Sequence, residues 1–378
     1  MIYLDHAATS WPKPQRVLDA MTACVLECVG NPSRAGHKLS VRAERVVSEA
    51  RTKLARFVGA DDPRRIIHCF NGTDALNIAI KGALRPCDHV ITTVLEHNSV
   101  SRPLQRLVDD RIITITHVPI GDDGRIDPDA VRRAITPHTR LIALTHASNV
   151  TGIIQPVPDV GRIAREHDLL LLVDAAQSAG LIDLNVNDLS VDLLVFSGHK
   201  SLLGPSGTGV LYVGERTSLS PWREGGTGGD SIKLTQPEEL PTLLEAGTPN
   251  MIGLAGLTAA IAEIDPARSL AHERSLMHRI VDGFGEIPRV QIVGNPSPGA
   301  RVGVLSFNIA DMQPTDVSAI LDQSFDIAVR PGLHCAPFAH QALNTFPDGA
   351  VRASLGWSTT TDEVDQFIRA VSELAEAQ

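Results

Sequence analysis

Two apolar stretches of the sequence end in a charged residue: Leu169-Leu-Leu-Leu-Val-Asp174 and Val191-Asp-Leu-Leu-Val-Phe-Ser-Gly-His-Lys200. Apolar runs of this length predict buried strands of an α/β sheet. Because the carboxyl ends of parallel strands meet at one edge of a sheet, Asp174 and Lys200 are expected to lie close together there. Charges in such a place are costly unless they are paired or take part in chemistry. The pair is therefore either a structural salt bridge or the centre of a reaction site.

One cofactor chemistry requires this pair of residues. Pyridoxal phosphate is held as a Schiff base by a lysine, and an acid keeps its ring nitrogen protonated. For two isolated residues the salt bridge is the simpler explanation, so the choice depends on the residues around them.

Length and composition are those of an ordinary globular protein. The 378 residues suffice for two domains, and 43% of them are hydrophobic and 21% charged. The net charge of -10 argues against a surface for nucleic acid or an anionic membrane, and no apolar run approaches the ~20 residues of a membrane span. The stretch Met1-Ile-Tyr-Leu-Asp-His6 lacks the basic segment of a signal peptide. The five cysteines, an odd number without a close pair, predict free thiols in a reducing cytoplasm.

The order of the predicted elements indicates two domains. Between residues 65 and 213, apolar strands alternate with helical patterns, which predicts a doubly wound, mostly parallel sheet in a large domain spanning residues 12–250. Residues 251–378, together with the segment 1–11, are expected to form a smaller α+β domain, and the Pro- and Gly-rich stretch 221–249 connects the two. The strands expected in the large sheet are 65–69, 89–92, 112–118, 141–145, 169–173, 193–196 and 209–213.

A possible anion site follows the first of these strands. Asn71-Gly-Thr-Asp74 opens a helix, where free backbone N–H groups and the helix dipole attract a phosphate and Thr73 can add a hydroxyl. The alternative is a plain helix cap, which Thr73 would also satisfy. Ser197 and His199, on either side of the glycine before Lys200, could donate to the same phosphate.

Three further polar residues follow predicted strands. His97 could stack its ring on an aromatic cofactor, although a lone histidine there is more often a capping or packing residue. Asn149 could hydrogen-bond a ring hydroxyl, and its alternative is a turn asparagine. Gln177, three residues after Asp174, is a second candidate for that hydroxyl.

The C-terminal part contains a candidate nucleophile. Arg330-Pro-Gly-Leu-His-Cys-Ala-Pro337 is predicted to be a loop by its Pro and Gly content, and it places Cys335 beside a histidine and near Arg330, which favours the reactive thiolate. The alternative is an ordinary small residue in a loop. Arg352 lies on a predicted strand and could bind a substrate carboxylate through two hydrogen bonds, unless it is a solvated surface charge.

Other chemistries are weakly supported. The glycine-rich stretch Gly225-Gly-Thr-Gly-Gly229 has no strand before it and no helix after it, which argues against a nicotinamide dehydrogenase. Gly204-Pro-Ser-Gly-Thr-Gly209 lacks the lysine of a phosphate-loop NTPase, and the fourteen histidines include no HExxH or close ligand cluster, so no metal is expected. A binding or scaffold protein with a vestigial site is the remaining non-enzymatic alternative.

Taken together, these residues resemble the class V aminotransferase family of fold-type I pyridoxal-phosphate enzymes and, within it, the cysteine desulfurase/selenocysteine lyase group. The resemblance spans essentially the whole chain, from Tyr3-Leu-Asp-His-Ala-Ala-Thr9 to Val351-Arg-Ala-Ser354. The SGHK stretch ending at Lys200 and the VDAAQ stretch ending at Gln177 carry the class, whereas the short cysteine loop resembles that of the SufS-type enzymes. His6 departs from the asparagine of many relatives.

The resemblance implies a role for each candidate. Lys200, Cys335 and His97 would be catalytic, and Arg352, Arg330 and Asn149 would bind the substrate. The residues implied to hold the cofactor are Lys200, Asp174, Gln177, His97, Thr73, Asn149, Ser197, His199 and Thr248.

The implied reaction converts L-cysteine to L-alanine and leaves a persulfide on Cys335 for an acceptor protein. Thr248, in Glu245-Ala-Gly-Thr-Pro-Asn250, matches a segment that reaches the phosphate of the other subunit, which implies a homodimer. Selenocysteine is the alternative substrate, and a transaminase, an epimerase or another lyase is the alternative activity of the same fold.

Overall fold

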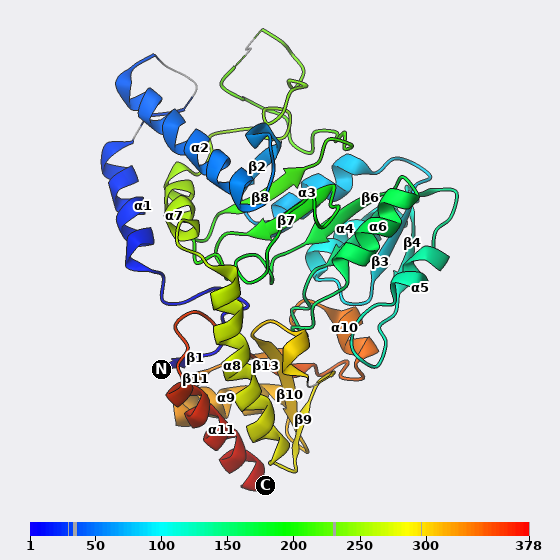
Figure 1. Ribbon diagram of the computed structural model, residues 1–378, viewed down its shortest axis with the longest axis vertical. Helices are drawn as coiled ribbons and strands as arrows, with labels where there is room; N and C mark the ends of the chain where they lie inside the picture. The colour runs from blue at the N-terminus through cyan, green and yellow to red at the C-terminus, as the bar shows by residue number, and fades with distance from the viewer. Residues whose placement is uncertain (29, 33–35, 230–231, 296, 378) are drawn as a thin grey trace.

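In the computed structural model of this chain, which describes residues 1–28, 30–32, 36–229, 232–295 and 297–377, most strands belong to two sheets. The larger sheet lies in the upper part of Figure 1 and the smaller one in the lower part. The larger sheet carries both charged strand ends that the sequence singles out.

The larger sheet has seven strands in the order β2-β8-β7-β6-β5-β3-β4. Strands β4, β3, β5, β6 and β7 run parallel to one another, whereas β8 is antiparallel to both β7 and β2. This confirms the predicted α/β class with a mostly parallel central sheet. The strands are β2 (Ile66–Cys69), β3 (His89–Thr93), β4 (Thr114–Val118), β5 (Thr139–Thr145), β6 (Leu170–Asp174), β7 (Leu193–Ser197) and β8 (Gly209–Val213).

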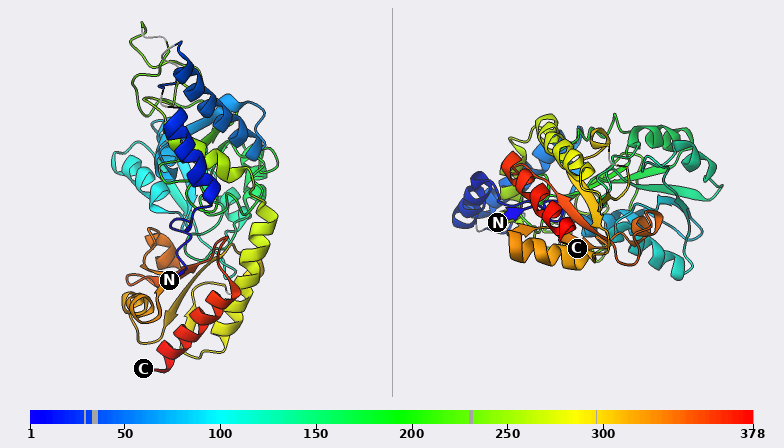
Figure 2. Two further views of the ribbon diagram at one scale, coloured as in Figure 1. Left: turned by 90° about the vertical axis from the view of Figure 1, so that its left-hand side faces the viewer. Right: turned by 90° about the horizontal axis from the view of Figure 1, so that it is seen from below.

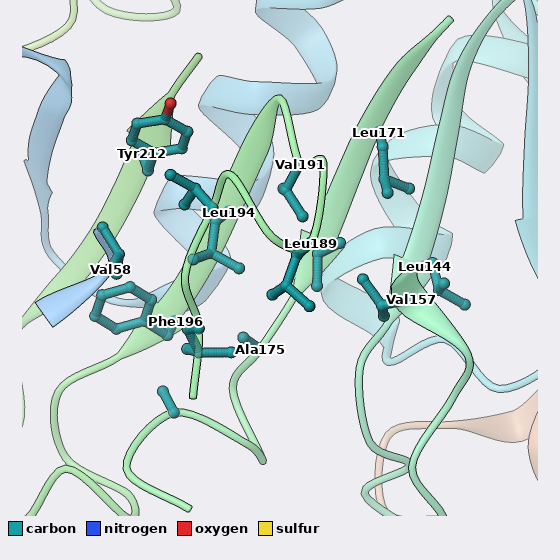
Figure 3. Packing of buried hydrophobic residues seen from close by; sticks show 14 of the residues in the cluster. Val58, Leu144, Val157, Leu171, Ala175, Leu189, Val191, Leu194, Phe196 and Tyr212 are labelled. Carbon is teal, nitrogen blue, oxygen red and sulfur yellow. The ribbon is translucent and has the colours of Figure 1, made fainter. Parts of the chain in front are cut away.

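The central strands are apolar throughout because both of their faces are covered. Every residue of β6 and β7 is buried, and successive side chains enter opposite hydrophobic clusters. Leu171 belongs to one cluster and Leu172 to the other. Figure 3 shows the first cluster, in which Phe196 and Tyr212 from the sheet pack near Val58. Burial on both faces explains why these strands read as continuous apolar runs rather than as alternating patterns.

Helices cover both faces of the large sheet. The cluster of Figure 3 includes residues of α2, α5, α6 and α7, and the opposite cluster includes residues of α3 and α4. Helix α1 packs against α7 at the left of Figure 1. The helices of this unit are α1 (Gln15–Glu27), α2 (Lys38–Phe57), α3 (Gly72–Ala83), α4 (Asn98–Asp109), α5 (Pro128–Arg133), α6 (Val157–Glu166) and α7 (Met251–Ile261), with a 3₁₀ turn at Pro63–Arg65.

The smaller sheet is antiparallel, with the strand order β12-β13-β10-β9. Its core contains Phe307 from β10, whose ring lies 4.9 Å from that of Phe284 and 5.9 Å from that of Phe367. The elements of this unit are α8 (Pro266–Gly285), β9 (Val290–Ile292), a 3₁₀ turn (Pro298–Ala300), β10 (Val304–Ile309), α9 (Pro314–Phe325), β11 (Ile327–Ala328), β12 (Arg330–Gly332), α10 (Pro337–Ala342), β13 (Ala350–Ser354) and α11 (Thr361–Glu376).

The N-terminal segment belongs to this smaller unit. Strand β1 (Ile2–Tyr3) pairs in parallel with β11, and Leu4 is fully buried in the small core. Both Figure 1 and Figure 2 place the two ends of the chain on this part of the molecule. Among the described residues, no helix combines the length and apolar character that crossing a membrane requires.

The packing of α7 bears on where the two units divide. Leu257 and Ile261 of α7 lie in the cluster on the large sheet, whereas Leu276 and Ile280 of α8 lie in the small core. Figure 2 shows α8 running from one unit to the other. The division expected after residue 250 stays a prediction, and we propose that it falls between α7 and α8.

One expectation was wrong in part. Residues 330–337 were expected to form a loop, but Arg330–Gly332 form the strand β12, in which Pro331 lies opposite Val351. Strand β12 is at the edge of its sheet, where a proline that lacks an N–H donor is tolerated. Cys335 follows in the turn between β12 and α10.

Candidate active site

A cavity of about 220 Å³ opens at the carboxyl edge of the large sheet. Its wall combines the N-terminal segment, the loops after the large-sheet strands, and the region of β12 and β13. The predicted site residues that line it are Thr73, His97, Asn149, Asp174, Gln177, Ser197, His199, Lys200, Arg330 and Arg352.

Lys200 and Asp174 meet at this edge as expected. Burial lowers the pKa of Lys200 to about 8, although the nearby Asp174 carboxylate opposes that shift. Burial also raises the pKa of Asp174, against the hydrogen bond from the Ala176 N–H to its Oδ1 (2.9 Å) and the attraction of Lys200. Both shifts favour the neutral forms, because desolvation outweighs the attraction between the two groups. Perturbed pKa values of this kind are typical of functional sites.

His97 is held with its ring in one orientation. Its Nδ1 accepts from the Ser99 N–H (3.0 Å) as the N-cap of α4, and the Ser99 hydroxyl lies 2.9 Å from the same nitrogen. Ser99 also contacts the Thr73 hydroxyl at 2.8 Å, which links the histidine to the start of α3. Burial, reinforced by the positive charge of Lys200, lowers the pKa of His97 to about 4. The ring is therefore neutral and carries its proton on Nε2.

The start of α3 forms a cradle that fits a phosphate. The Gly72 N–H lies 3.2 Å from the Ser197 hydroxyl, and a Cβ on Gly72 would approach that oxygen to 2.7 Å. His199 adds a buried Nδ1 that has no hydrogen-bond partner among the described residues. The helix N-terminus, a hydroxyl and an unsatisfied imidazole nitrogen are donors suited to an anion.

The turn before Lys200 is fastened by the N-terminal segment. The carbonyl oxygen of His199 accepts from the Ser10 N–H (3.0 Å), the Thr9 hydroxyl (3.1 Å) and the Lys13 ammonium (2.8 Å). These donors hold the backbone on which Lys200 projects into the cavity.

Arg352 is a buried cation, and one of its N–H groups has no hydrogen-bond partner among the described residues. Its Nη2 bonds the Asp5 carboxylate at 2.7 Å, and its Nη1 bonds the Asn149 carbonyl at 3.1 Å. Its Nε is buried and has no partner in the described structure. A substrate carboxylate in the cavity would satisfy that N–H.

The amide nitrogens of Asn149 and Gln177 already donate hydrogen bonds to the protein backbone. Asn149 donates from Nδ2 to the carbonyl oxygen of His334 (2.7 Å), and Gln177 donates from Nε2 to that of Ala7 (3.1 Å). Each bond ties the edge of the large sheet to another part of the wall. Each amide retains its oxygen as an acceptor for a ring hydroxyl.

Cys335 lies beside the cavity rather than in its wall. Its Sγ is 3.6 Å from Nη2 of Arg330, and its carbonyl oxygen accepts from the N–H of Asn98, next to His97. The thiol is half-buried, with the guanidinium of Arg330 as its neighbour.

The structure does not bring Thr248 to this cavity. Thr248 lines a separate hollow of about 350 Å³, formed by α2, β2 and the segment before α7. The Glu245 carboxylate fastens this segment, because it bonds the Arg51 guanidinium at 2.9 and 2.8 Å and the His68 N–H at 2.6 Å.

Sequence reasoning gave no role to two residues of the site: Asp5 neutralises Arg352, and Ser99 orients His97. It gave His334 only an influence on the Cys335 thiol, whereas in the structure His334 also lines the cavity. Only Ser99 had a local signal, its position two residues after His97. Asp5 lies within the Tyr3–Thr9 stretch of the resemblance, but its partner is 347 residues away.

The fold and this site define a fold-type I α/β enzyme, with a lysine opposite a buried acid at the carboxyl edge of a mostly parallel sheet. Residues 2–367 match the family described as Aminotransferase class-V. The chain belongs to this family, whose members generally depend on pyridoxal phosphate.

Several relatives of the chain are named cysteine desulfurases. A protein named probable cysteine desulfurase from Methanothermobacter thermautotrophicus is 36% identical over 386 aligned residues, which cover 99% of this chain and 94% of that protein. A cysteine desulfurase from Serratia proteamaculans is 35% identical over 99% of this chain and 93% of its own length. The solved apo structure of cysteine desulfurase from Thermococcus onnurineus NA1 is similar with a TM-score of 0.94 and 35% identity, and covers 100% of this chain and 95% of that one.

Proposed function

We propose that this chain is a pyridoxal-phosphate-dependent cysteine desulfurase, which converts L-cysteine to L-alanine and keeps the sulfur as a persulfide on Cys335. The observation that carries the proposal is the Cys335 thiol beside the Arg330 guanidinium, at the rim of a cavity that contains Lys200 and Asp174. A transaminase on this fold would have no use for a thiolate there.

The residues present fit the cofactor. The Asp174 carboxyl would hold the ring nitrogen, His97 the ring face, and the cradle of Gly72, Ser197 and His199 the phosphate. Bound to the Lys200 amine, the cofactor supplies an electron sink for the bonds at the substrate Cα.

The protein's own groups then have separate tasks. The Arg352 guanidinium, with its free Nε, binds the substrate carboxylate. Freed when the substrate amine takes its place on the cofactor, the Lys200 amine, with its pKa lowered to about 8 by burial, takes the proton from Cα. The Cys335 thiolate attacks the substrate sulfur, so that an S–S bond forms while the substrate C–S bond breaks. The electron pair of the broken bond stays on the substrate Cβ, which takes up a proton and becomes a methyl group. Lys200 then returns a proton to Cα, which completes L-alanine.

The test compares two cysteine variants. Cys335→Ala should retain the visible absorption of the bound cofactor but lose most of the alanine production from L-cysteine, because no nucleophile accepts the sulfur. Cys87→Ala removes an exposed free thiol and is the matched control. Mass spectrometry of the native protein after one turnover should find 32 Da, roughly one sulfur atom, added to the Cys335 peptide. Unchanged turnover in Cys335→Ala would return the chain to the general lyase or transaminase activities.

We also propose that the enzyme is a homodimer in which Thr248 of one copy completes the phosphate site of the other. Supporting this is the firm anchoring of the Thr248 segment by Glu245 and Arg51 at a hollow separate from its own cavity. The Thr248 hydroxyl does not line the cavity of its own copy, so it is available to contact the phosphate bound in a second copy.

A mixing experiment tests sharing of the site. Lys200→Ala and Thr248→Ala should each be impaired alone. When copies of the two are exchanged, the hybrid contains one site with an intact Lys200 and the partner's intact threonine, so activity should return. If mixing restores nothing while sedimentation shows that hybrids have formed, Thr248 does not act across the interface.

The compartment we propose is the cytoplasm, where an acceptor protein would take the persulfide sulfur.

A further inference from the structure

The cysteine turn has an unusual backbone. His334 and Cys335 have φ values of 50° and 58°, in the left-handed region that side chains other than glycine rarely adopt. Each such residue costs about 1–3 kcal/mol and persists only where its surroundings hold it. Two hydrogen bonds to carbonyl oxygens help to hold this backbone. Asn149 Nδ2 donates to the His334 oxygen and the Asn98 N–H donates to the Cys335 oxygen, both at 2.7 Å.

A buried chain of side chains holds the same turn from behind. His334 Nε2 lies 3.0 Å from the Arg330 carbonyl oxygen, and His334 Nδ1 lies 3.2 Å from His340 Nε2. His340 Nδ1 in turn lies 2.7 Å from the Thr345 hydroxyl. Both imidazoles are buried, at 2% and 0% exposure.

The chemistry of its ends sets the direction of this chain. The Arg330 carbonyl can only accept, so His334 carries its proton on Nε2 and its Nδ1 is an acceptor. His340 must then donate from Nε2, and its Nδ1 accepts from the Thr345 hydroxyl. Burial lowers the pKa of His334 to about 3 and that of His340 to about 4, so both rings are neutral, as this arrangement requires.

We propose that His340 is a positioning residue for sulfur transfer: by donating to His334 Nδ1 it keeps His334 bonded to the Arg330 carbonyl and so holds the Cys335 thiol against the Arg330 guanidinium. Arg330 makes two contacts in this arrangement: its carbonyl oxygen accepts from His334, and its guanidinium contacts the Cys335 thiol. His340 lies outside the wall of the cavity and acts only through the turn. The inference rests on the proposed role of Cys335.

Removing the donor has a defined consequence. Without His340 Nε2–H, His334 Nδ1 becomes a buried acceptor without a partner, and the ring can regain a partner for that nitrogen only by rotating away from the Arg330 carbonyl. The strained turn would then relax, and a displacement of about 1 Å at a reacting atom can cost about a hundredfold in rate. Binding of the substrate carboxylate by Arg352 should be unaffected.

The test uses two pairs of variants. His340→Leu removes both nitrogens, whereas His340→Gln retains a donor and an acceptor. We expect His340→Leu to lower kcat for alanine formation by about tenfold to a hundredfold with little change in KM, and His340→Gln to stay within about threefold of the wild type. Thr345→Val should cost about threefold, whereas Thr345→Ser, which retains the hydroxyl, should not.

Two further measurements separate positioning from general damage. In the Cys335→Ala background, His340→Leu should cause no additional loss of residual alanine formation, because its effect acts through the thiol. Nitrogen-15 NMR of labelled histidines should assign the proton of His334 to Nε2 in the wild type, a result that does not depend on catalysis.

Three outcomes would overturn the proposal: wild-type kcat in His340→Leu, equal losses in the Leu and Gln variants, or a His334 proton on Nδ1. Full activity of Cys335→Ala would instead refute the proposed function, and it would leave the NMR result on the histidine chain standing. The two failures are therefore distinguishable.

Discussion

Replacing Glu273 by glutamine should change how stability depends on pH. Glu273 lies on α8 with 4% of its surface exposed, and its Oε2 accepts from the Gly303 N–H at 2.9 Å. Burial raises the pKa of this carboxyl from 4.5 to about 8, and the single hydrogen bond only partly opposes the shift. The folded protein therefore holds the proton of Glu273 at neutral pH, whereas the unfolded chain has lost it.

The sign and size follow from that difference. A carboxyl whose pKa is raised by folding stabilises the folded state below its unfolded pKa, and this contribution disappears as the pH rises through the folded pKa. One pKa unit corresponds to about 1.4 kcal/mol, so raising the pH from 6 to 9 should remove about 3 kcal/mol through Glu273 alone. Glutamine does not ionise and can still accept from the Gly303 N–H through its amide oxygen.

The assay is denaturant unfolding of both proteins at pH 6, 7.5 and 9. The wild type should lose about 3 kcal/mol more than Glu273→Gln over this interval, so the variant should be the more stable protein at pH 9. Glu286→Gln, at an exposed carboxyl at the end of the same helix, should keep the wild-type pH dependence. Identical pH profiles for the wild type and Glu273→Gln would refute the argument and would mean that water in the small cavity between Glu273 and His6 solvates the carboxylate.

Three other changes test the cradle, the small core and the substrate side. Gly72→Ala should displace the Ser197 hydroxyl and weaken cofactor binding by about tenfold, measured by fluorescence titration, whereas Gly285→Ala, whose Cβ meets nothing within 4 Å, should not. Phe307→Ala should lower the free energy of unfolding by about 3–5 kcal/mol in chemical denaturation, because its fully buried ring packs against two others. Arg352→Lys should raise KM for L-cysteine by about tenfold in steady-state assays, because an ammonium cannot replace the forked guanidinium, and an unchanged KM would remove Arg352 from the substrate site.

The central sheet could be predicted because its signals are local. The apolar runs of β6 and β7 are buried on both faces, and their charged ends lie one and four residues after the last apolar residue. The sequence therefore placed Asp174 and Lys200 at one edge without knowledge of the rest. Their catalytic roles, and those of the other cavity residues, remain predictions.

Helix α2 was not predicted because its buried face carries few large apolar residues. Val47 and Leu54 lie on that face, and its other buried residues are small or polar: Ser40, Ala43, Ala50, Arg51 and Ala55. Strand β12 was missed for a related reason, since Pro331 and Gly332 are read as loop residues unless the sheet edge beside them is known.

The remaining parts of the site depend on contacts between distant segments. The Asp5–Arg352 pair joins β13 to the N-terminal segment, and the chain of His334 and His340 depends on the turn that brings α10 behind β12. Each residue type has several ordinary roles, and only the folded backbone selects one of them.

The pairing of β1 with β11 has a consequence for how the protein is made. Ile2 and Leu4 belong to the small core, yet their partners in β11 and β13 are synthesised more than three hundred residues later. At about 5–20 residues per second, the ribosome therefore leaves this apolar segment without its native partners for tens of seconds, while the large sheet can already form. Because Asp5 comes from the same segment, the nascent chain cannot form the buried Asp5–Arg352 pair, and with it the proposed substrate site, before β13 has emerged.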